Sequence, residues 1–179
     1  MKNVVTPQNL INGRFSSNQP SVLTGFPAGS VIDSVVIYGG VRSADADYLL
    51  RVDSPGITIK SVEITGGVSA GDTKADWMRN AANGMLIIGD NVTVNRFECS
   101  NIHTGATLRG CNGRINGGLI SVFSGDGLQL VADGCEVENI EMSGSIEAFP
   151  YEQFHRDLVQ LWKHGGGTLT GCVVSGIRY

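Results

Sequence analysis

The sequence predicts an all-β fold, a single-stranded parallel β-helix of about seven coils with two long loops on one side. A phrase of the form apolar-x-x-apolar-x-apolar recurs seven times, as LINGRF (10–15), IDSVVI (32–37), IKSVEI (59–64), VNRFEC (94–99), INGGLI (115–120), VENIEM (137–142) and LTGCVV (169–174). The copies start 22, 27, 35, 21, 22 and 32 residues apart. A period near 21–22 residues with occasional insertions is typical of a solenoid, in which each copy stacks on the previous one. The alternative is a β-sandwich or another all-β fold with evenly spaced strands.

A second ladder of strand-like runs supports the β-helix. The runs lie 11 or 12 residues before five of the phrases, as YLLRV (48–52), NGMLII (83–88), TGATL (104–108), DGLQL (126–130) and DLVQL (157–161). Two ladders that keep their phase across insertions predict which distant residues stack. The expected inward positions include Val62, Phe97, Ile140 and Cys172, whereas Gly118 interrupts the apolar pattern.

Length and composition indicate one domain without a membrane span. Residues 1–30 are expected to form an irregular cap or tether, and residues 31–179 the β-helix. The 25 glycines suit a fold with many turns, and a charged fraction of 17% argues against disorder. The apolar runs are too short to cross a membrane, and no basic leader precedes an apolar segment. A net charge of −4 without a Lys/Arg cluster makes nucleic acid an unexpected partner.

The four cysteines do not have the spacing of a metal site, so we expect neither a metal nor another cofactor. Cys99 and Cys172 occupy expected inward positions and are interpreted as buried thiols. Cys111 and Cys135 lie at the turn before consecutive coils. A disulfide between these two and four free thiols both fit this arrangement, and free thiols fit it better.

Three insertions, 38–47, 65–82 and 143–156, fall at the same corner of the repeat. Insertions in repeat proteins gather on one face, so the two long ones are expected to wall a trough over residues 94–120. Their aromatic side chains, among them Trp77 and Tyr151, are candidate substrate-binding residues. The alternative is that these rings fix their own loops to the coil.

The first position of the second ladder forms a column of Tyr48, Asn83, Thr104, Asp126 and Asp157. Stacked β-strands lie about 4.8 Å apart, so the two carboxylates are expected to be neighbours. Two adjacent carboxyl groups are what glycoside hydrolysis uses, and this makes Asp126 and Asp157 a candidate catalytic pair. Aspartate at a strand entry also binds nearby backbone amides, which is the structural alternative.

Further candidates surround this pair. Gln129 and Gln160 lie three residues after the two aspartates, on outward positions, and are candidate substrate-binding residues. His155, a candidate catalytic residue, and Arg156, a candidate substrate-binding residue, precede Asp157. Asn83 in the same column and Lys163 after the last second-ladder strand complete the candidate substrate-binding set.

The phrases SGDGLQL (124–130) and FHRDLVQLW (154–162) resemble the His-x-Asp-x-x-Gln rungs of the pectate-lyase-like superfamily, which includes phage tailspikes and polysaccharide-degrading enzymes. The resemblance implies a right-handed coil and carbohydrate contact on the outer face. It also implies self-association, since phage β-helix proteins are commonly trimers. The expected end of the last copy at Val174 lacks a polar cap, which favours a covering subunit or partner as well.

These observations lead to three hypotheses. The favoured one is a virion-associated or extracellular protein, tailspike-like or surface-decorating, that binds bacterial surface polysaccharide and can cleave it as a glycoside hydrolase or polysaccharide lyase. It would assemble with other virion proteins and form a homo-oligomer, with a trimer expected. The second is a structural decoration protein of a phage particle without a glycan ligand. The third is a free-standing polysaccharide lyase or hydrolase, which usually needs more coils.

Overall fold

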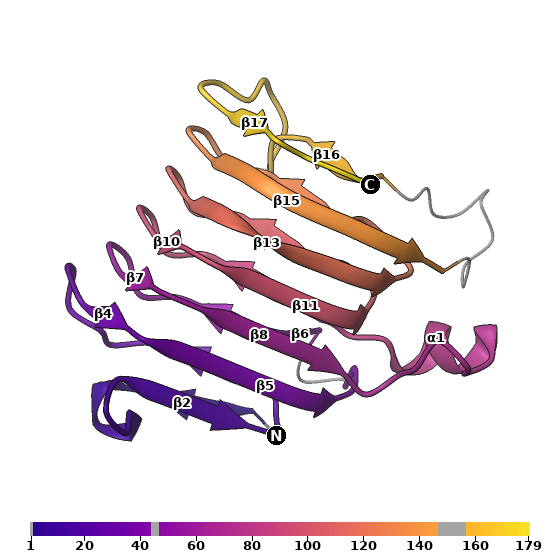
Figure 1. Cartoon of the computed structure of the whole chain (residues 1–179). Coiled ribbons are helices and arrows are strands. Elements are labelled where there is room, and N and C mark those ends of the chain that lie inside the picture. Colours follow the sequence, from indigo (N-terminus) through magenta and orange to yellow (C-terminus); the bar gives the residue numbers. More distant parts are fainter. Residues whose placement is uncertain (1, 44–46, 147–156) are drawn as a thin grey trace.

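The computed structural model describes residues 2–43, 47–146 and 157–179, and it is all-β with parallel sheets (Figure 1). Every pairing between two named strands is parallel. Sheet A has seven strands, in the order β1 (Asn3–Val5), β3 (Ser21–Leu23), β6 (Tyr48–Val52), β9 (Asn83–Ile87), β12 (Ala106–Leu108), β14 (Leu128–Leu130) and β16 (Val159–Leu161). Strand order follows chain order, as expected when successive repeats stack.

Sheet B has ten strands, several of them short pieces of one row. Its members are β2 (Arg14–Ser17), β4 (Val31–Ile32), β5 (Ser34–Gly40), β7 (Thr58–Ile59), β8 (Val62–Gly66), β10 (Thr93–Val94), β11 (Phe97–Ile102), β13 (Arg114–Phe123), β15 (Glu136–Ser145) and β17 (Val173–Ser175). The long strand β13 pairs with both β10 and β11, and β15 lies between β13 and β17. In the described part of the chain, the helical elements are the 3-10 helix η1 (Pro7–Asn9) and the helix α1 (Lys74–Asn80). No helix among residues 2–43, 47–146 and 157–179 is long and apolar enough to cross a membrane.

The register of sheet A confirms the second ladder. Leu50 pairs with Met85, Met85 with Ala106, Ala106 with Leu128 and Leu128 with Val159. These side chains point to the core, because residues alternate between the two faces of a strand. The outward neighbours therefore also form a column, and that column carries the candidate site.

The register of sheet B agrees with the expected phase in the middle of the chain. Val62 pairs with Phe97, and Gly118 pairs with both Phe97 and Ile140. Gly118 interrupts the apolar pattern for a steric reason: it has φ +150°, and a side chain there would collide with the backbone of Phe97. The glycine is thus required by the close approach of the two strands.

At the C-terminal end the expected register is wrong. Val137 pairs with Val174, not with Leu169, and a further bridge joins Glu141 to Arg178. The last copy of the phrase is therefore VSGIRY (174–179), which has the same apolar spacing as LTGCVV. Cys172 consequently lies outside the stack of Val62, Phe97 and Ile140.

The N-terminal end differs in a similar way. Phe15 pairs with Val35, so the first copy is shifted by two residues from LINGRF, in which Gly13 was expected at that position. Residues 1–30, expected to be irregular, contain β1 and β3 of sheet A and β2 of sheet B. These strands extend the same two sheets toward the N-terminus.

The core lies between the sheets and is apolar, with aliphatic side chains in the majority. Its largest fully buried side chains include Phe97, Phe123, Leu49, Leu50 and Ile59. A second, smaller cluster is formed by Val68, Trp77 and Ala81 in and beside α1, where the Thr73 side chain accepts the Asp76 N–H and so caps the helix. The insertion 65–82 thus has a small core of its own.

Candidate functional site

The outer face of sheet A carries a column of side chains that follows directly from its register. Arg51, Leu86, Thr107, Gln129 and Gln160 are paired in succession from β6 to β16. Each lies between two inward apolar residues of its own strand. The alternation of the sequence therefore places polar groups from four strands in one row.

Hydrogen bonds connect Thr107, Gln129 and Gln160 of this column with Tyr48 and Asp126, whereas Arg51 binds Asp53. The Tyr48 and Thr107 hydroxyls are 3.1 Å apart, and the Thr107 hydroxyl donates to Gln129 Oε1 at 3.1 Å. Because a threonine hydroxyl has one hydrogen, Tyr48 must donate to Thr107 Oγ1. Gln129 Nε2 donates to Asp126 Oδ2 at 2.7 Å and to Gln160 Oε1 at 3.3 Å. The hydrogen bonds thus run in one direction across the sheet, with Tyr48 as the first donor and Gln160 as the last acceptor.

A cavity of about 260 Å³ opens over this column; we call it the Trp162 cavity. It is lined by Asp47, Tyr48, Leu86, Thr107, Arg109, Gln129, Val131 and Trp162. Burial is the main cause that raises the pKa of Tyr48, so its hydroxyl stays protonated at neutral pH. Trp162 remains 43% exposed. The cavity combines a flat aromatic surface with hydroxyl, amide and guanidinium groups.

Arg109 is held at the rim of the Trp162 cavity by His164. Arg109 Nη2 lies 3.0 Å from His164 Nδ1. A guanidinium only donates, so His164 Nδ1 accepts and its ring proton lies on Nε2. The Trp162 and His164 rings meet edge to face with centroids 6.1 Å apart. The Arg109 charge is therefore positioned beside the exposed indole.

Asp126 and Asp157 lie at neighbouring strand entries, as the shared column predicted, since Gly127 N–H donates to the Asp157 carbonyl. The Asp126 side chain is only 7% exposed. Its Oδ2 accepts from Gln129, and its Oδ1 accepts the Asp157 N–H at 3.1 Å. One carboxylate oxygen of Asp126 thus binds a side chain of its own strand, and the other binds the backbone at the entry of the next strand, in the manner of the structural alternative.

His103 lies in the same corner as Asp126. Its Nδ1 is 3.1 Å from Ser124 Oγ. Burial lowers the pKa of His103 and outweighs the opposite effect of the Asp126 charge. A serine beside a histidine is the arrangement of a nucleophile and its base, but Ser124 is fully buried. Its hydroxyl cannot reach a polymeric substrate in this conformation.

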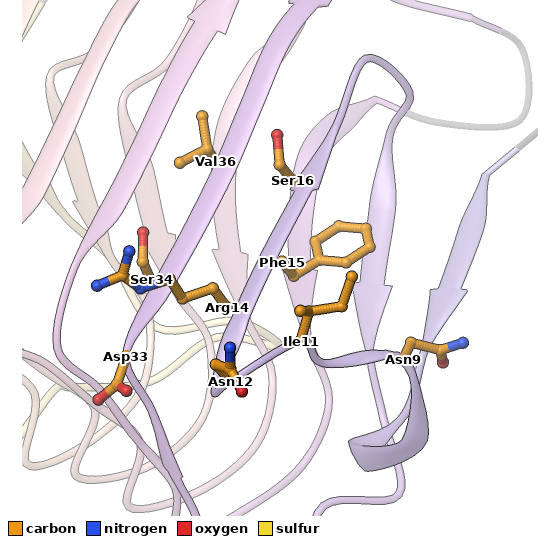
Figure 2. Close-up of a pocket in the computed structure, with 9 residues that line it drawn as sticks. All are labelled: Asn9, Ile11, Asn12, Arg14, Phe15, Ser16, Asp33, Ser34 and Val36. Atoms are coloured by element: carbon orange, nitrogen blue, oxygen red, sulfur yellow. The ribbon is translucent and has the colours of Figure 1, made fainter.

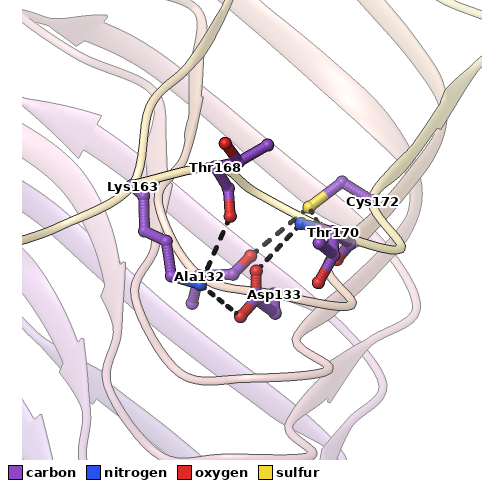
Figure 3. A network of polar contacts seen from close by, with 6 residues as sticks. All are labelled: Ala132, Asp133, Lys163, Thr168, Thr170 and Cys172. Atoms are coloured by element: carbon purple, nitrogen blue, oxygen red, sulfur yellow. Dashed lines mark hydrogen bonds and ion pairs between the residues drawn. The ribbon is translucent and has the colours of Figure 1, made fainter. Parts of the chain in front are cut away.

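The remaining predicted site residues that the structure describes lie in different environments, away from the Trp162 cavity lining. Trp77 is fully buried and donates from Nε1 to the Ser69 carbonyl at 2.8 Å, so it fixes its own loop, and the expectation of a binding surface is corrected. Asn83 pairs with Tyr48, and its Oδ1 is buried without a hydrogen-bond partner among the described atoms. Lys163 donates to Asp133 Oδ2 at 2.7 Å and to the Thr168 carbonyl at 3.3 Å, so it braces a turn (Figure 3). Tyr151, His155 and Arg156 lie outside the described residues.

A larger cavity, about 840 Å³, lies at the N-terminal end and is lined by residues of β2, of β5 and of the segments that precede them (Figure 2). Its walls include Arg14, Ser16, Asp33, Ser34 and Val36. None of the predicted site residues lines it, and Asp33 is bound to Lys60 at 2.6 Å. We favour the smaller Trp162 cavity as the candidate site, because it holds an exposed indole and a connected row of polar side chains.

Among residues 2–43, 47–146 and 157–179, no group of three or more His, Cys, Asp and Glu side chains gathers where a metal ion could bind. Comparisons with protein-family models, curated proteins and solved structures gave no match to this chain. The assignment of the candidate site is therefore based on the geometry of its residues.

The repeat pattern of the sequence did not indicate Arg109, Trp162, His164 or Thr107 as site residues. The position of Thr107 could have been predicted, because it corresponds to that of Gln129 one repeat later. Trp162 directly follows β16, and Arg109 directly follows β12; both strands belong to the second ladder. An aromatic or basic residue directly after a second-ladder strand is therefore the sequence signal that both share.

Proposed function

We propose that the chain is a single-stranded right-handed parallel β-helix of about seven coils that binds bacterial surface polysaccharide at the Trp162 cavity. The seven strands of sheet A support the coil count, and the resemblance of SGDGLQL and FHRDLVQLW to tailspike rungs supports the handedness. We place the protein on a virion or in the extracellular space, as a tailspike-like or surface-decorating module. The observation that carries the proposal is the exposed indole beside the connected polar row.

This combination matches the chemistry of a sugar. A pyranose ring has an apolar C–H face and a rim of hydroxyls, so it packs on an aromatic ring while its hydroxyls exchange hydrogen bonds. Trp162 offers the aromatic surface. The oxygens of Tyr48 and Gln129 can accept hydrogen bonds from sugar hydroxyls, because each retains a lone pair beside its bonds within the row. Arg109 adds a cation for an anionic substituent.

The size of the cavity favours one sugar unit within a longer chain. Its volume of about 260 Å³ is just below the roughly 300 Å³ at which pockets for drug-sized ligands begin. The column continues past it to Gln160 on β16. A polysaccharide would insert one residue beside Trp162 and lie along the outer face of sheet A with its neighbours.

We propose binding as the primary role and do not assign acid–base catalysis to Asp126. A general acid has to present its carboxyl group to the glycosidic oxygen. Both oxygens of Asp126 are already engaged by Gln129 and by the Asp157 N–H. Cleavage remains part of the experimental test, with Asp157 as the group to examine if oligosaccharides are released.

The test is a titration with a panel of bacterial capsular polysaccharides and lipopolysaccharides, followed by calorimetry. An aromatic contact is worth about 1.4 kcal/mol, which is roughly tenfold in affinity, so Trp162→Ala should weaken binding by about that factor. Met78→Ala on α1 is the matched control, because Met78 is also 43% exposed but lies outside the cavity lining.

Fluorescence gives a second readout, because the chain has two tryptophans and Trp77 is buried. A bound glycan should protect Trp162 from quenching by acrylamide and leave Trp77 unchanged. Equal affinities of the wild-type protein and the Trp162→Ala variant would overturn the site. No binding to any polysaccharide would favour a structural decoration protein, and released oligosaccharides would favour an enzyme.

A further inference from the structure

Cys135 and Cys172 lie side by side on neighbouring strands. The pairing of β15 with β17 starts at Glu136 and Val173, immediately after the two cysteines. Val173 N–H donates to the Cys135 carbonyl at 2.9 Å, and Gly134 N–H donates to the Thr170 carbonyl at 2.9 Å. In a parallel ladder these two bonds place Cys135 directly opposite Cys172.

The backbone separation suits a disulfide. Neighbouring strands lie about 4.8 Å apart, and disulfide-bonded Cα atoms are usually about 4.4–6.8 Å apart. One residue earlier, a Cβ atom built on Gly171 would lie 3.8 Å from Gly134 Cα, so the two segments approach closely at this point. Cys135 is fully buried, and Cys172 packs against the same core while remaining partly exposed. The two side chains therefore face the same way.

Both sulfurs are at present thiols that donate to carbonyls of the preceding repeat. Cys135 Sγ lies 3.5 Å from the Gly110 carbonyl, and Cys172 Sγ lies 3.3 Å from the Ala132 carbonyl (Figure 3). Such thiol hydrogen bonds are weak. Rotation of the two side chains toward each other breaks only these two weak hydrogen bonds, and the register of the two strands does not change.

The other two cysteines are poorly placed to compete. Asn112 N–H donates to the Asp133 carbonyl at 2.9 Å, which places Cys111 opposite Asp133, two positions before Cys135. Cys111 is exposed, whereas Cys135 is buried. The register thus argues against the Cys111–Cys135 bond that the sequence left open. Cys99 lies on β11, within the core of sheet B.

We propose that Cys135 and Cys172 are a site of disulfide formation, with a low-molecular-weight disulfide such as oxidised glutathione as the oxidant. The Cys172 thiolate, which is the more accessible, attacks one sulfur of the small disulfide and releases one small thiolate. The Cys135 thiol then loses its proton and attacks the Cys172 sulfur of the mixed disulfide, releasing the second small thiolate. Two protein thiols are oxidised, one small disulfide is reduced, and two small thiols leave with the two protons.

Burial raises the pKa of Cys135 to about 11, so the second step is expected to be slow at neutral pH and faster in mild alkali. The bond would join β17 covalently to β15. It lies next to the contacts of Asp133 with Lys163 and Thr170, which also hold this end of the chain (Figure 3).

The experiment incubates the folded full-length protein with oxidised glutathione at pH 8.5 and counts free thiols by alkylation and mass spectrometry. The count should fall from four to two, and a proteolytic map should contain a peptide linked through Cys135 and Cys172. The thermal midpoint of the oxidised protein should rise by several degrees, because the cross-link restricts the unfolded chain.

Cys111→Ser is the matched control and should still form the bond, whereas Cys172→Ser should not form it. Cys172 is partly exposed, so this replacement leaves the core intact, and circular dichroism verifies its fold. Four thiols that persist in the folded wild-type protein, or a linked peptide that contains Cys111, would overturn the proposal.

Discussion

Strands β14 and β16 have nearly the same sequence and opposite exposure. DGLQL (126–130) gives Leu128 and Leu130, both fully buried, whereas DLVQL (157–161) gives Leu161, which is 55% exposed. The two strands are paired in register. The difference is that β14 has a neighbouring strand on each side, while β16 is the last strand of sheet A. Burial here depends on a following repeat and not on the phrase itself.

Sheet B shows the same gradient. Val137 on β15 is fully buried, and its partner Val174 on β17 is 36% exposed. Apolar side chains contribute stability roughly in proportion to the area they remove from water. Equivalent substitutions should therefore have large effects in the middle of the chain and small effects at its C-terminal end.

The largest effect is expected for a charge in the middle of the stack. Phe97→Asp should abolish folding, because a buried unpaired carboxylate costs several kcal/mol, comparable to the whole stability of a domain. Val174→Asp on the exposed last strand should cost less than about 1 kcal/mol. Circular dichroism and urea titration measure both, and a folded Phe97→Asp protein would refute the register of sheet B.

Glycine replacements give the next comparison. Gly118→Ala should destabilise the protein by about 4 kcal/mol, since the new Cβ meets the Phe97 backbone in a strained conformation. Gly166 also has a positive φ, +89°, but an added Cβ there meets no atom within 4 Å. Gly166→Ala should cost about 1 kcal/mol, from backbone strain alone. Similar losses in urea titrations of the two variants would contradict the close approach at Gly118.

Leucine truncation compares the two similar strands themselves. Leu128→Ala should cost about 3 kcal/mol, because it removes buried methyl groups and leaves a cavity. Leu161→Ala should cost less than about 1 kcal/mol. If a second subunit covers β16, the Leu161→Ala loss should approach the Leu128→Ala loss and depend on protein concentration. The same pair of variants, unfolded at two concentrations, thus also tests self-association.

The smallest effect is expected from an ion pair near the C-terminal end. The hydrogen bond from Lys163 is the main cause that lowers the pKa of Asp133 below its ordinary value of 3.8. The resulting stability is present above the ordinary pKa and is lost as the pH falls through the lowered pKa. Lys163→Met should raise the pKa of Asp133 toward 3.8, as measured by NMR titration of the carboxyl carbon.

Lys60→Met is the control for this titration. Lys60 lowers the pKa of Asp33 at the other end of the molecule. Its removal should raise the pKa of Asp33 and leave the pKa of Asp133 unchanged. A shift of both carboxyl groups in either variant would indicate a general change of fold instead of two separate pairs.

The register of sheet A could be predicted from the sequence from β6 to β16. The inward positions of its strands are all apolar, and a shift by one residue would turn every side chain to the wrong face. The pairing of Gln129 with Gln160 followed from that pattern. The insertions did not disturb the prediction, because they fall between strands.

The last copy in sheet B was predicted wrongly because two overlapping segments carry the same pattern. LTGCVV and VSGIRY both have the apolar spacing of the phrase, and they start five residues apart. The pairing of Val174 with Val137 decides between them, and contacts such as the bond from Thr170 N–H to Asp133 hold Leu169 in the preceding turn. These contacts join distant repeats, so a pattern within one repeat could not reveal them.

The candidate site was predictable only in part. The outward polar column follows from strand alternation, and it contained Gln129 and Gln160. The Trp162 cavity is also lined by residues that come directly after a strand ends, such as Arg109 and Trp162. The direction of a side chain after a strand ends is set by the local turn, which periodicity does not determine.

The pairing of β13 with β15 has a consequence for how such a chain can change its length. Arg114 and Glu136 are bonded partners that lie 22 residues apart, and each residue of one strand has its counterpart at the same offset in the other. A duplicated segment of this length, inserted after Ser145, could present to β15 the edge that β17 now presents. Gene duplication of one repeat would lengthen the molecule without redesigning any existing contact in its middle. The present last strands would then pair with the duplicated ones, and their apolar side chains would keep their exposure at the end of the sheets.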